Sequence, residues 1–136
     1  GWAVPAAVGA KILRPQRPVM AVTGDGGFMM TSNAISTAIQ NDAPIVIVVF
    51  NDGALGMVRE HQRHDKIIIA SEFVSTNYAR LCQAYGGWGV QVNDSKEIPT
   101  AIHDAFNSGV ASVVDVTIDD KEIFNQFHAK IRKKIR

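Results

Sequence analysis

Residues 45–50 read IVIVVF, an uninterrupted apolar run in which every side chain is β-branched except that of the closing Phe50. Such a run is typical of a parallel strand that is covered on both faces, because a half-exposed strand would alternate apolar and polar residues. A second short apolar run, residues 19–23, precedes it, and segments of helical composition lie around both. We therefore expect an α/β domain with three layers, in which helices flank a mostly parallel central sheet.

The other elements follow from helix caps and from Gly and Pro breakers. Thr76 or Asn77 is expected to cap one helix, and Ser95 the next, which can hold Pro99 only in its first turn. Residues 64–75 are expected to form a linker. The expected helices cover residues 5–13, 31–40, 56–63, 76–85 and 95–107, and the remaining strands cover residues 88–92 and 111–118.

Length and composition describe one globular domain. The chain has 136 residues, 46% hydrophobic and 20% charged, which suffices for a core without disulfides. A net charge of +1 argues against the broad basic surface of a general nucleic-acid binder. Cys82 is the only cysteine, which favours a reducing, cytoplasmic location. No apolar run approaches the roughly 18 residues of a membrane span, so we expect no membrane partner.

The two ends of the sequence differ from its middle. The chain begins with Gly1 rather than Met, so we expect it to be part of a longer protein. At the other end, residues 120–136 are predicted to form an amphipathic basic helix, separate from a domain of residues 1–119. Its apolar face would hold Ile123, Phe124, Phe127, Ile131 and Ile135. We expect it to dock on its own protein, with contact to a membrane surface or nucleic acid as the weaker alternative.

A glycine-rich turn, residues 24–28 (GDGGF), directly follows the first expected strand. In open parallel sheets, ligands bind beyond the carboxyl ends of the strands. Gly24 and Gly26 permit a tight turn and a close approach of the backbone. The amides of Gly27 and Phe28, at the start of the next helix, can face phosphate oxygens. The turn therefore suits an anionic ligand.

Asp25 lies within this turn and would repel a phosphate unless a cation lay between them. At about 5 Å and an effective dielectric constant near 20, attraction and repulsion differ by roughly 6–7 kcal/mol. Asp52, at the end of the run 45–50, supplies a second carboxylate. Mg²⁺ typically binds one or two carboxylates together with phosphate oxygens and water. The two strand ends therefore predict a site for a phosphate with its divalent cation.

Other interpretations of these residues are weaker. A lone Gly-Asp-Gly, or the pair Asp52-Gly53, is often an ordinary turn. The turn lacks the Gly-Lys-Ser/Thr of a P-loop, and a dinucleotide-binding turn would leave Asp25 unshielded beside the pyrophosphate. A phosphatase with Asp25 as nucleophile would need a second Asp where Gly27 stands. The two strand ends taken together favour the metal-dependent site.

The spacing of these residues resembles a known motif. Residues 24–26 read GDG and residues 51–52 read ND, as in the motif with which thiamine-diphosphate-dependent enzymes bind their cofactor. Residues 1–10 resemble the run that precedes this motif, and residues 56–58 (GMV) resemble the following loop of acetolactate synthases. From residue 1 to about 119, the chain is similar to the C-terminal, pyrophosphate-binding domain of such enzymes.

The resemblance implies a role for each matching residue. The side chains of Asp25 and Asp52 and the backbone carbonyl of Ala54 would bind Mg²⁺. His61 is a candidate for contact with the substrate. The residues implied around the thiamine diphosphate are Gly24, Gly26, Gly27, Phe28, Asn51, Gly56 and Met57, with Met57 near the thiazolium ring.

The sequence departs from the family pattern at three places. Asp52 replaces the second Asn of the motif, which adds a negative charge but keeps a hard oxygen ligand for a cation. His61 stands where many biosynthetic acetolactate synthases carry Trp, so a preference for 2-ketobutyrate as second substrate is not implied. The family's Met that supports the bent cofactor would precede Gly1.

The resemblance also implies that part of the active site lies elsewhere. In the family, a Glu on a pyrimidine-binding domain, usually that of a partner subunit, activates the cofactor. We therefore expect no catalytic residue in this chain, little activity from it alone, and a homodimeric or homotetrameric parent. The implied reaction decarboxylates pyruvate and joins the product to a second 2-keto acid, in branched-chain amino acid biosynthesis. The alternatives are a pyruvate oxidase, another 2-keto acid decarboxylase, or a non-catalytic module of the same fold.

Overall fold

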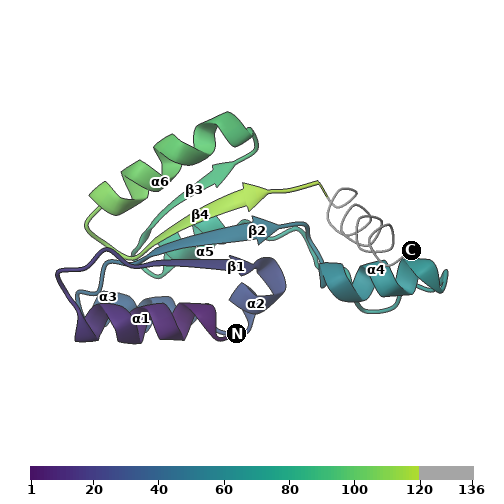
Figure 1. Ribbon diagram of the computed structural model, residues 1–136, viewed down its shortest axis with the longest axis horizontal. Coiled ribbons are helices and arrows are strands. Elements are labelled where there is room, and N and C mark those ends of the chain that lie inside the picture. Colours follow the sequence, from purple (N-terminus) through teal and green to yellow (C-terminus); the bar gives the residue numbers. More distant parts are fainter. Residues whose placement is uncertain (120–136) are drawn as a thin grey trace, which may run out of the picture.

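The computed structural model describes residues 1–119 and contains one parallel sheet (Figure 1). Its four strands lie in the order β1-β2-β4-β3. The strands are β1 (Met20–Gly24), β2 (Val46–Asn51), β3 (Trp88–Val92) and β4 (Ser112–Thr117). All three pairings are parallel. The predicted strands lie within one residue of these bounds.

Helices cover both faces of this sheet. On one face lie α1 (Ala3–Leu13), α2 (Asp25–Met29), α3 (Ala34–Gln40) and α5 (Tyr78–Ala84). On the other face lies α6 (Ile98–Asn107), preceded by a 3-10 turn at Ser95–Glu97. Figure 1 shows α4 (Gly56–His64) beyond the carboxyl ends of the strands. The predicted three-layer α/β architecture is confirmed.

The run IVIVVF is buried because each face of β2 belongs to a different core cluster. Ile47 and Val49 pack with the helices α1, α2, α3 and α5. Val46 and Val48 pack with α6 and with β4. A strand with helices on both sides has no solvated face, which explains why its sequence does not alternate.

The register of the sheet brings the expected site residues to one edge. Gly24, the last residue of β1, pairs with Phe50, and Asn51, the last residue of β2, pairs with Thr117. Asp25 and Asp52 are the next residues in the chain. They therefore leave neighbouring strands at the same carboxyl edge, where ligands of parallel sheets bind.

Two local features differ from the sequence predictions, and a third decides between two predicted helix caps. The helix predicted for residues 31–40 begins only at Ala34, because residues 25–29 form a separate short helix, α2. Asn77, rather than Thr76, caps α5, and its side chain accepts a hydrogen bond from the amide of Arg80. The predicted cap Ser95 is wrong. The helical segment begins one residue earlier, with a 3-10 turn, so Asp94 accepts from the amide of Lys96.

Two expectations concern other parts of the chain. The amphipathic basic helix predicted for residues 120–136 lies outside the described residues. Among residues 1–119, no helix has the length and apolar character needed to cross a bilayer.

Candidate metal and cofactor site

Asp25 connects the end of β1 to the loop that follows β2. It is the first residue of α2, and its side chain is only 2% exposed. Its Oδ1 accepts a hydrogen bond of 2.7 Å from the amide of Gly26, and its Oδ2 accepts one of 3.2 Å from the amide of Ala54. Both oxygens thus have a fixed direction at the sheet edge.

The surroundings of Asp25 favour the approach of a cation. Burial raises the pKa of its carboxyl above the ordinary value, and the negative charge of Asp52 raises it further. Hydrogen bonds from the amides of Gly26, Ala54 and Gly53 act in the opposite direction. A divalent cation between the two carboxylates would offset both burial and repulsion, because it stabilises their charged forms.

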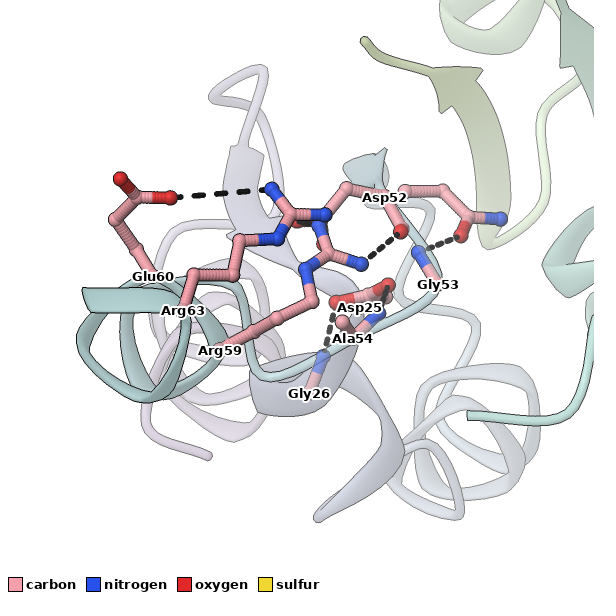
Figure 2. Close-up of polar contacts among 9 residues, drawn as sticks. Asp25, Gly26, Asp52, Gly53, Ala54, Arg59, Glu60 and Arg63 are labelled. Atoms are coloured by element: carbon pink, nitrogen blue, oxygen red, sulfur yellow. Dashed lines mark hydrogen bonds and ion pairs between the residues drawn. The ribbon is translucent and has the colours of Figure 1, made fainter. Parts of the chain in front are cut away.

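Asp52 is held by an arginine that comes from α4. Nη2 of Arg59 lies 2.7 Å from Oδ2 of Asp52, and both side chains are almost fully buried (Figure 2). Nη1 of Arg59 also donates to the backbone carbonyl of Asp52, at 3.3 Å. A Cβ atom at Gly56 would lie 2.6 Å from Oδ2 of Asp52. Glycine at position 56 therefore leaves the room that the Asp52 carboxylate occupies.

The loop after β2 is fixed by a segment of the linker predicted at residues 64–75. The amide of Phe73 donates to the carbonyl of Gly53 at 2.7 Å, and the amide of Leu55 donates to the carbonyl of Ser71 at 2.8 Å. These bonds flank an antiparallel bridge between Ala54 and Glu72. The carbonyl oxygen of Ala54 accepts no hydrogen bond from any donor in residues 1–119, so it has lone pairs available for a ligand.

The chemistry of these groups fits Mg²⁺. Two carboxylates and a backbone carbonyl form a set of hard oxygen donors, which Mg²⁺ prefers, and this ion keeps several sites for phosphate and water. Within residues 1–119 no three His, Cys, Asp or Glu side chains lie close enough to hold a metal by themselves. A cation here would therefore need Ala54 and its other ligands, such as a diphosphate, to complete its shell.

A buried carboxylate that the sequence analysis did not select, Asp115, holds Asn51. Asp115 is fully buried in β4, where its Oδ1 accepts from Nδ2 of Asn51 at 2.9 Å. Its Oδ2 accepts from the amide of Tyr78, at the start of α5, at 2.9 Å. Burial raises the pKa of Asp115, while its hydrogen bonds from Asn51 and Tyr78 lower it. Asp115 thus links β2, β4 and α5 below the sheet edge.

A cavity of about 570 Å³ opens beside Asp52. Asn51, Asp52 and Gly53 form one wall, and residues 117–119, at the end of β4 and just after it, form another. The segment before α5 and Gln91 complete the lining. Its lining combines polar groups from three strand ends with the apolar residues Phe73 and Ile118. Asp52 therefore borders a space of the size of a small-molecule site.

The structure places the remaining predicted residues at different depths. Phe28 is fully buried and packs edge-to-face on Tyr78 at 5.2 Å, so only its backbone could face a ligand. Gly26 and Gly27 are tightly packed, since a Cβ would lie 2.7 Å from Leu55 and 2.8 Å from Thr23, respectively. Gly24 ends β1, beside Asp25.

Met57 and His61 lie apart from this buried group. They stand one turn apart on α4, and both are exposed. Arg59 points from the same helix in the other direction, toward Asp52 (Figure 2). The structure thus brings Asp25, Asp52 and Ala54 together and leaves Met57 and His61 on an open surface.

The sequence does contain weak signals for Asp115 and Arg59, the two buried residues of the site that were not predicted from it. Asp115 is the only charged residue of the expected strand 111–118, and a carboxylate there must find partners. Arg59 lies one turn into a helix that begins just after Asp52, but many helices carry arginines on their surface. Its burial depends on tertiary packing.

The comparisons with known proteins agree with this geometry. The family model of the C-terminal, thiamine pyrophosphate (TPP)-binding domain of thiamine pyrophosphate enzymes matches residues 1–116. The chain is 34% identical, over 131 residues, to the acetolactate synthase isozyme 3 large subunit of Escherichia coli. That match covers 90% of this chain but 22% of the relative, so the chain spans about a fifth of its length.

Two solved structures share the fold with a TM-score of 0.78 each. A thiamine diphosphate-dependent 4-hydroxybenzoylformate decarboxylase of Rhodococcus jostii is 25% identical, with 88% of this chain and 24% of that one covered. A benzoylformate decarboxylase of Polynucleobacter necessarius is 26% identical, with 89% and 24% covered. The chain belongs to the family of C-terminal TPP-binding domains of thiamine pyrophosphate enzymes, and it is homologous to acetolactate synthase large subunits.

Proposed function

We propose that this domain binds the diphosphate of thiamine diphosphate through Mg²⁺. The side chains of Asp25 and Asp52 and the carbonyl of Ala54 would hold the cation. The observation that carries this proposal is the buried Asp25, which is fixed by the amide of Ala54 at the edge where Asp52 also lies. A buried carboxylate next to a second one is costly without a cation.

The cofactor residues proposed here surround that cation site. The backbone at Gly24, Gly26, Gly27 and Phe28 would face the phosphate oxygens. Asn51, Gly56 and Met57 would contact the rest of the cofactor. When bound, thiamine diphosphate supplies the group that attacks a 2-keto acid and stabilises the carbanion left by loss of CO₂. The chain's own part is to bind, orient and neutralise the diphosphate, while the activating Glu would lie on another domain.

The activity we propose is that of an acetolactate synthase, which decarboxylates pyruvate and joins the product to a second 2-keto acid. The homology to large subunits of that enzyme supports it. His61, exposed on α4, would lie on the substrate side. Branched-chain amino acid biosynthesis is the corresponding role.

A second candidate is a 2-keto acid decarboxylase or oxidase. The solved structures that share the fold include two decarboxylases, which supports it. The deciding experiment supplies the complete protein that contains this chain with ¹³C-pyruvate, thiamine diphosphate and Mg²⁺, and identifies the products by NMR. Acetolactate supports carboligation, whereas acetaldehyde or acetate supports the second candidate. No turnover of pyruvate or other 2-keto acids, with no cofactor binding, would support a non-catalytic module.

The proposal includes a partner, since half of the cofactor site would come from the pyrimidine-binding domain of a second subunit in a homodimer or homotetramer. Large apolar side chains on the surface support such contacts, among them Trp2, 82% exposed, and Val74, 86% exposed.

We also propose a division into residues 1–119 and 120–136. The free, buried thiol of Cys82 is consistent with the cytoplasmic location we propose.

A further inference from the structure

Besides its two carboxylates, the candidate cation site contains a third charged side chain, that of Arg59. Asp25 and Asp52 together carry two negative charges when ionised, and the charge of Asp52 acts on Asp25. Arg59 adds one positive charge in direct contact with Asp52, in almost complete burial. The three side chains therefore sum to one negative charge. Such a sum still attracts a divalent cation, and it repels an anionic diphosphate less than two uncompensated carboxylates would.

The contacts of Arg59 leave part of Asp52 available. The guanidinium binds Oδ2 of Asp52 through Nη2 and the backbone carbonyl of the same residue through Nη1. No donor among residues 1–119 binds Oδ1 of Asp52. Figure 2 shows Arg59 reaching toward Asp52 from α4, while Asp25 is bound to backbone amides. One carboxylate oxygen is thus paired with the arginine, and the other can bind a metal.

We propose that Arg59 is a charge-compensating and positioning residue of the cation site. It neutralises one of the two carboxylates and directs Asp52 so that Oδ1 can bind the divalent cation. This inference rests on the proposed function, because it requires that the pair binds a cation. It follows that an Asn at position 52 suits this site only if the positive charge at position 59 is also removed.

The test measures Mn²⁺ binding to the complete protein by calorimetry and by electron paramagnetic resonance, without substrate. Asp52→Asn brings the summed charge of the three side chains from one negative charge to zero, so the Mn²⁺ affinity should fall about tenfold or more. The double variant Asp52→Asn/Arg59→Met should recover an affinity within about threefold of the unmodified protein, because the charge sum returns to one negative charge. Asp52→Asn/Arg59→Lys keeps the positive charge and should remain weak.

Two controls separate this role from packing. Arg63→Met removes an arginine of the same helix that pairs with Glu60 at 3.8 Å, and it should leave Mn²⁺ binding unchanged. Thermal unfolding of every variant checks the fold, and Arg59→Gln replaces Arg59→Met if the latter does not fold.

Each outcome has one meaning. Failure of Arg59→Met to restore affinity, equal restoration by Arg59→Lys, or no effect of Asp52→Asn would overturn the inference. Mn²⁺ binding that survives Asp25→Ala would instead refute the proposed function, since the cation would then bind elsewhere.

Discussion

A side chain at position 56 would need the space that the Asp52 carboxylate occupies. A methyl group at position 56 would meet Oδ2 of Asp52 at 2.6 Å, closer than real Cβ contacts. We predict that Gly56→Ala displaces the Asp52 carboxylate and weakens Mn²⁺ binding by about tenfold, equivalent to roughly 1.4 kcal/mol. Mn²⁺ titration of the complete protein measures this effect.

Gly9→Ala is the matched control for that variant. Gly9 lies within α1, and nothing approaches its Cβ position within 4 Å. This change should leave Mn²⁺ affinity untouched and stabilise the helix by about 0.5–1 kcal/mol, because alanine favours helix over glycine. Equal losses of affinity in both variants would show that the space at position 56 does not control the site.

Asp115 gives the domain a specific pH dependence. Burial raises the pKa of its carboxyl above 3.8, so the folded state holds this proton more tightly than the unfolded state. Between 3.8 and the raised pKa, Asp115 therefore makes the free energy of unfolding fall as the pH rises. Asp115→Asn should remove that contribution. The melting temperature of the two proteins, compared between about pH 4 and about pH 7, measures it.

The control for Asp115→Asn is Asp104→Asn, which changes an exposed carboxylate on α6. That variant should follow the pH profile of the unmodified protein. The prediction for Asp115 fails if its variant and the unmodified protein show parallel profiles over the whole range.

At the scale of the elements, the 3-10 turn that precedes α6 has two neighbouring residues that could cap it, Asp94 and Ser95. Asp94, and not Ser95, accepts from the amide of Lys96. Asp94→Ala should therefore weaken this helix start by about 1 kcal/mol, whereas Ser95→Ala should change it by only a few tenths. Hydrogen exchange of the Lys96 amide, in the 3-10 turn before α6, reports this locally. Faster exchange in Ser95→Ala than in Asp94→Ala would contradict the assignment.

The strands were predictable because each apolar run is short, rich in β-branched residues and bounded by turns. Their parallel pairing then brings Asp25 and Asp52 to one edge, so the carboxylate pair could be expected from the sequence. Helix α2 could not be predicted, because a segment with two glycines has low helix propensity. The helix forms here within tertiary packing. The prediction of Ser95 as the cap was wrong because the preceding residue, Asp94, is an equally favourable capping residue.

The contacts that the site residues make with other side chains and backbone could not be predicted from the sequence. The ion pair of Arg59 with Asp52 depends on how α4 leaves the sheet edge, and the bond of Asn51 to Asp115 joins residues far apart in the chain. The bridge of Ala54 to Glu72 belongs to a stretch without periodicity. Such contacts are set by the packed fold rather than by local propensity.

The whole molecule should respond to cation and cofactor together. Ligands that bind only the folded state stabilise it by about 2.7 kcal/mol at a concentration of 100 times Kd. We predict that thiamine diphosphate with Mg²⁺ raises the melting temperature of the complete protein by several degrees. Either ligand alone, or both with excess EDTA, should raise it much less. Full stabilisation by thiamine diphosphate in EDTA would contradict a metal-bridged diphosphate.

Strand β1 pairs only with β2 among residues 1–119, so one of its edges presents unpaired backbone groups. Its residues Met20 and Val22 are also about half exposed, on the α6 side of the sheet but outside the cluster that α6 covers. An apolar strand with a free edge is a template for another strand and a known route to aggregation. The domain therefore needs this edge of β1 to be covered, in addition to binding its cofactor. Preparations in which this edge is covered should stay monodisperse, whereas those that leave it bare should precipitate with concentration.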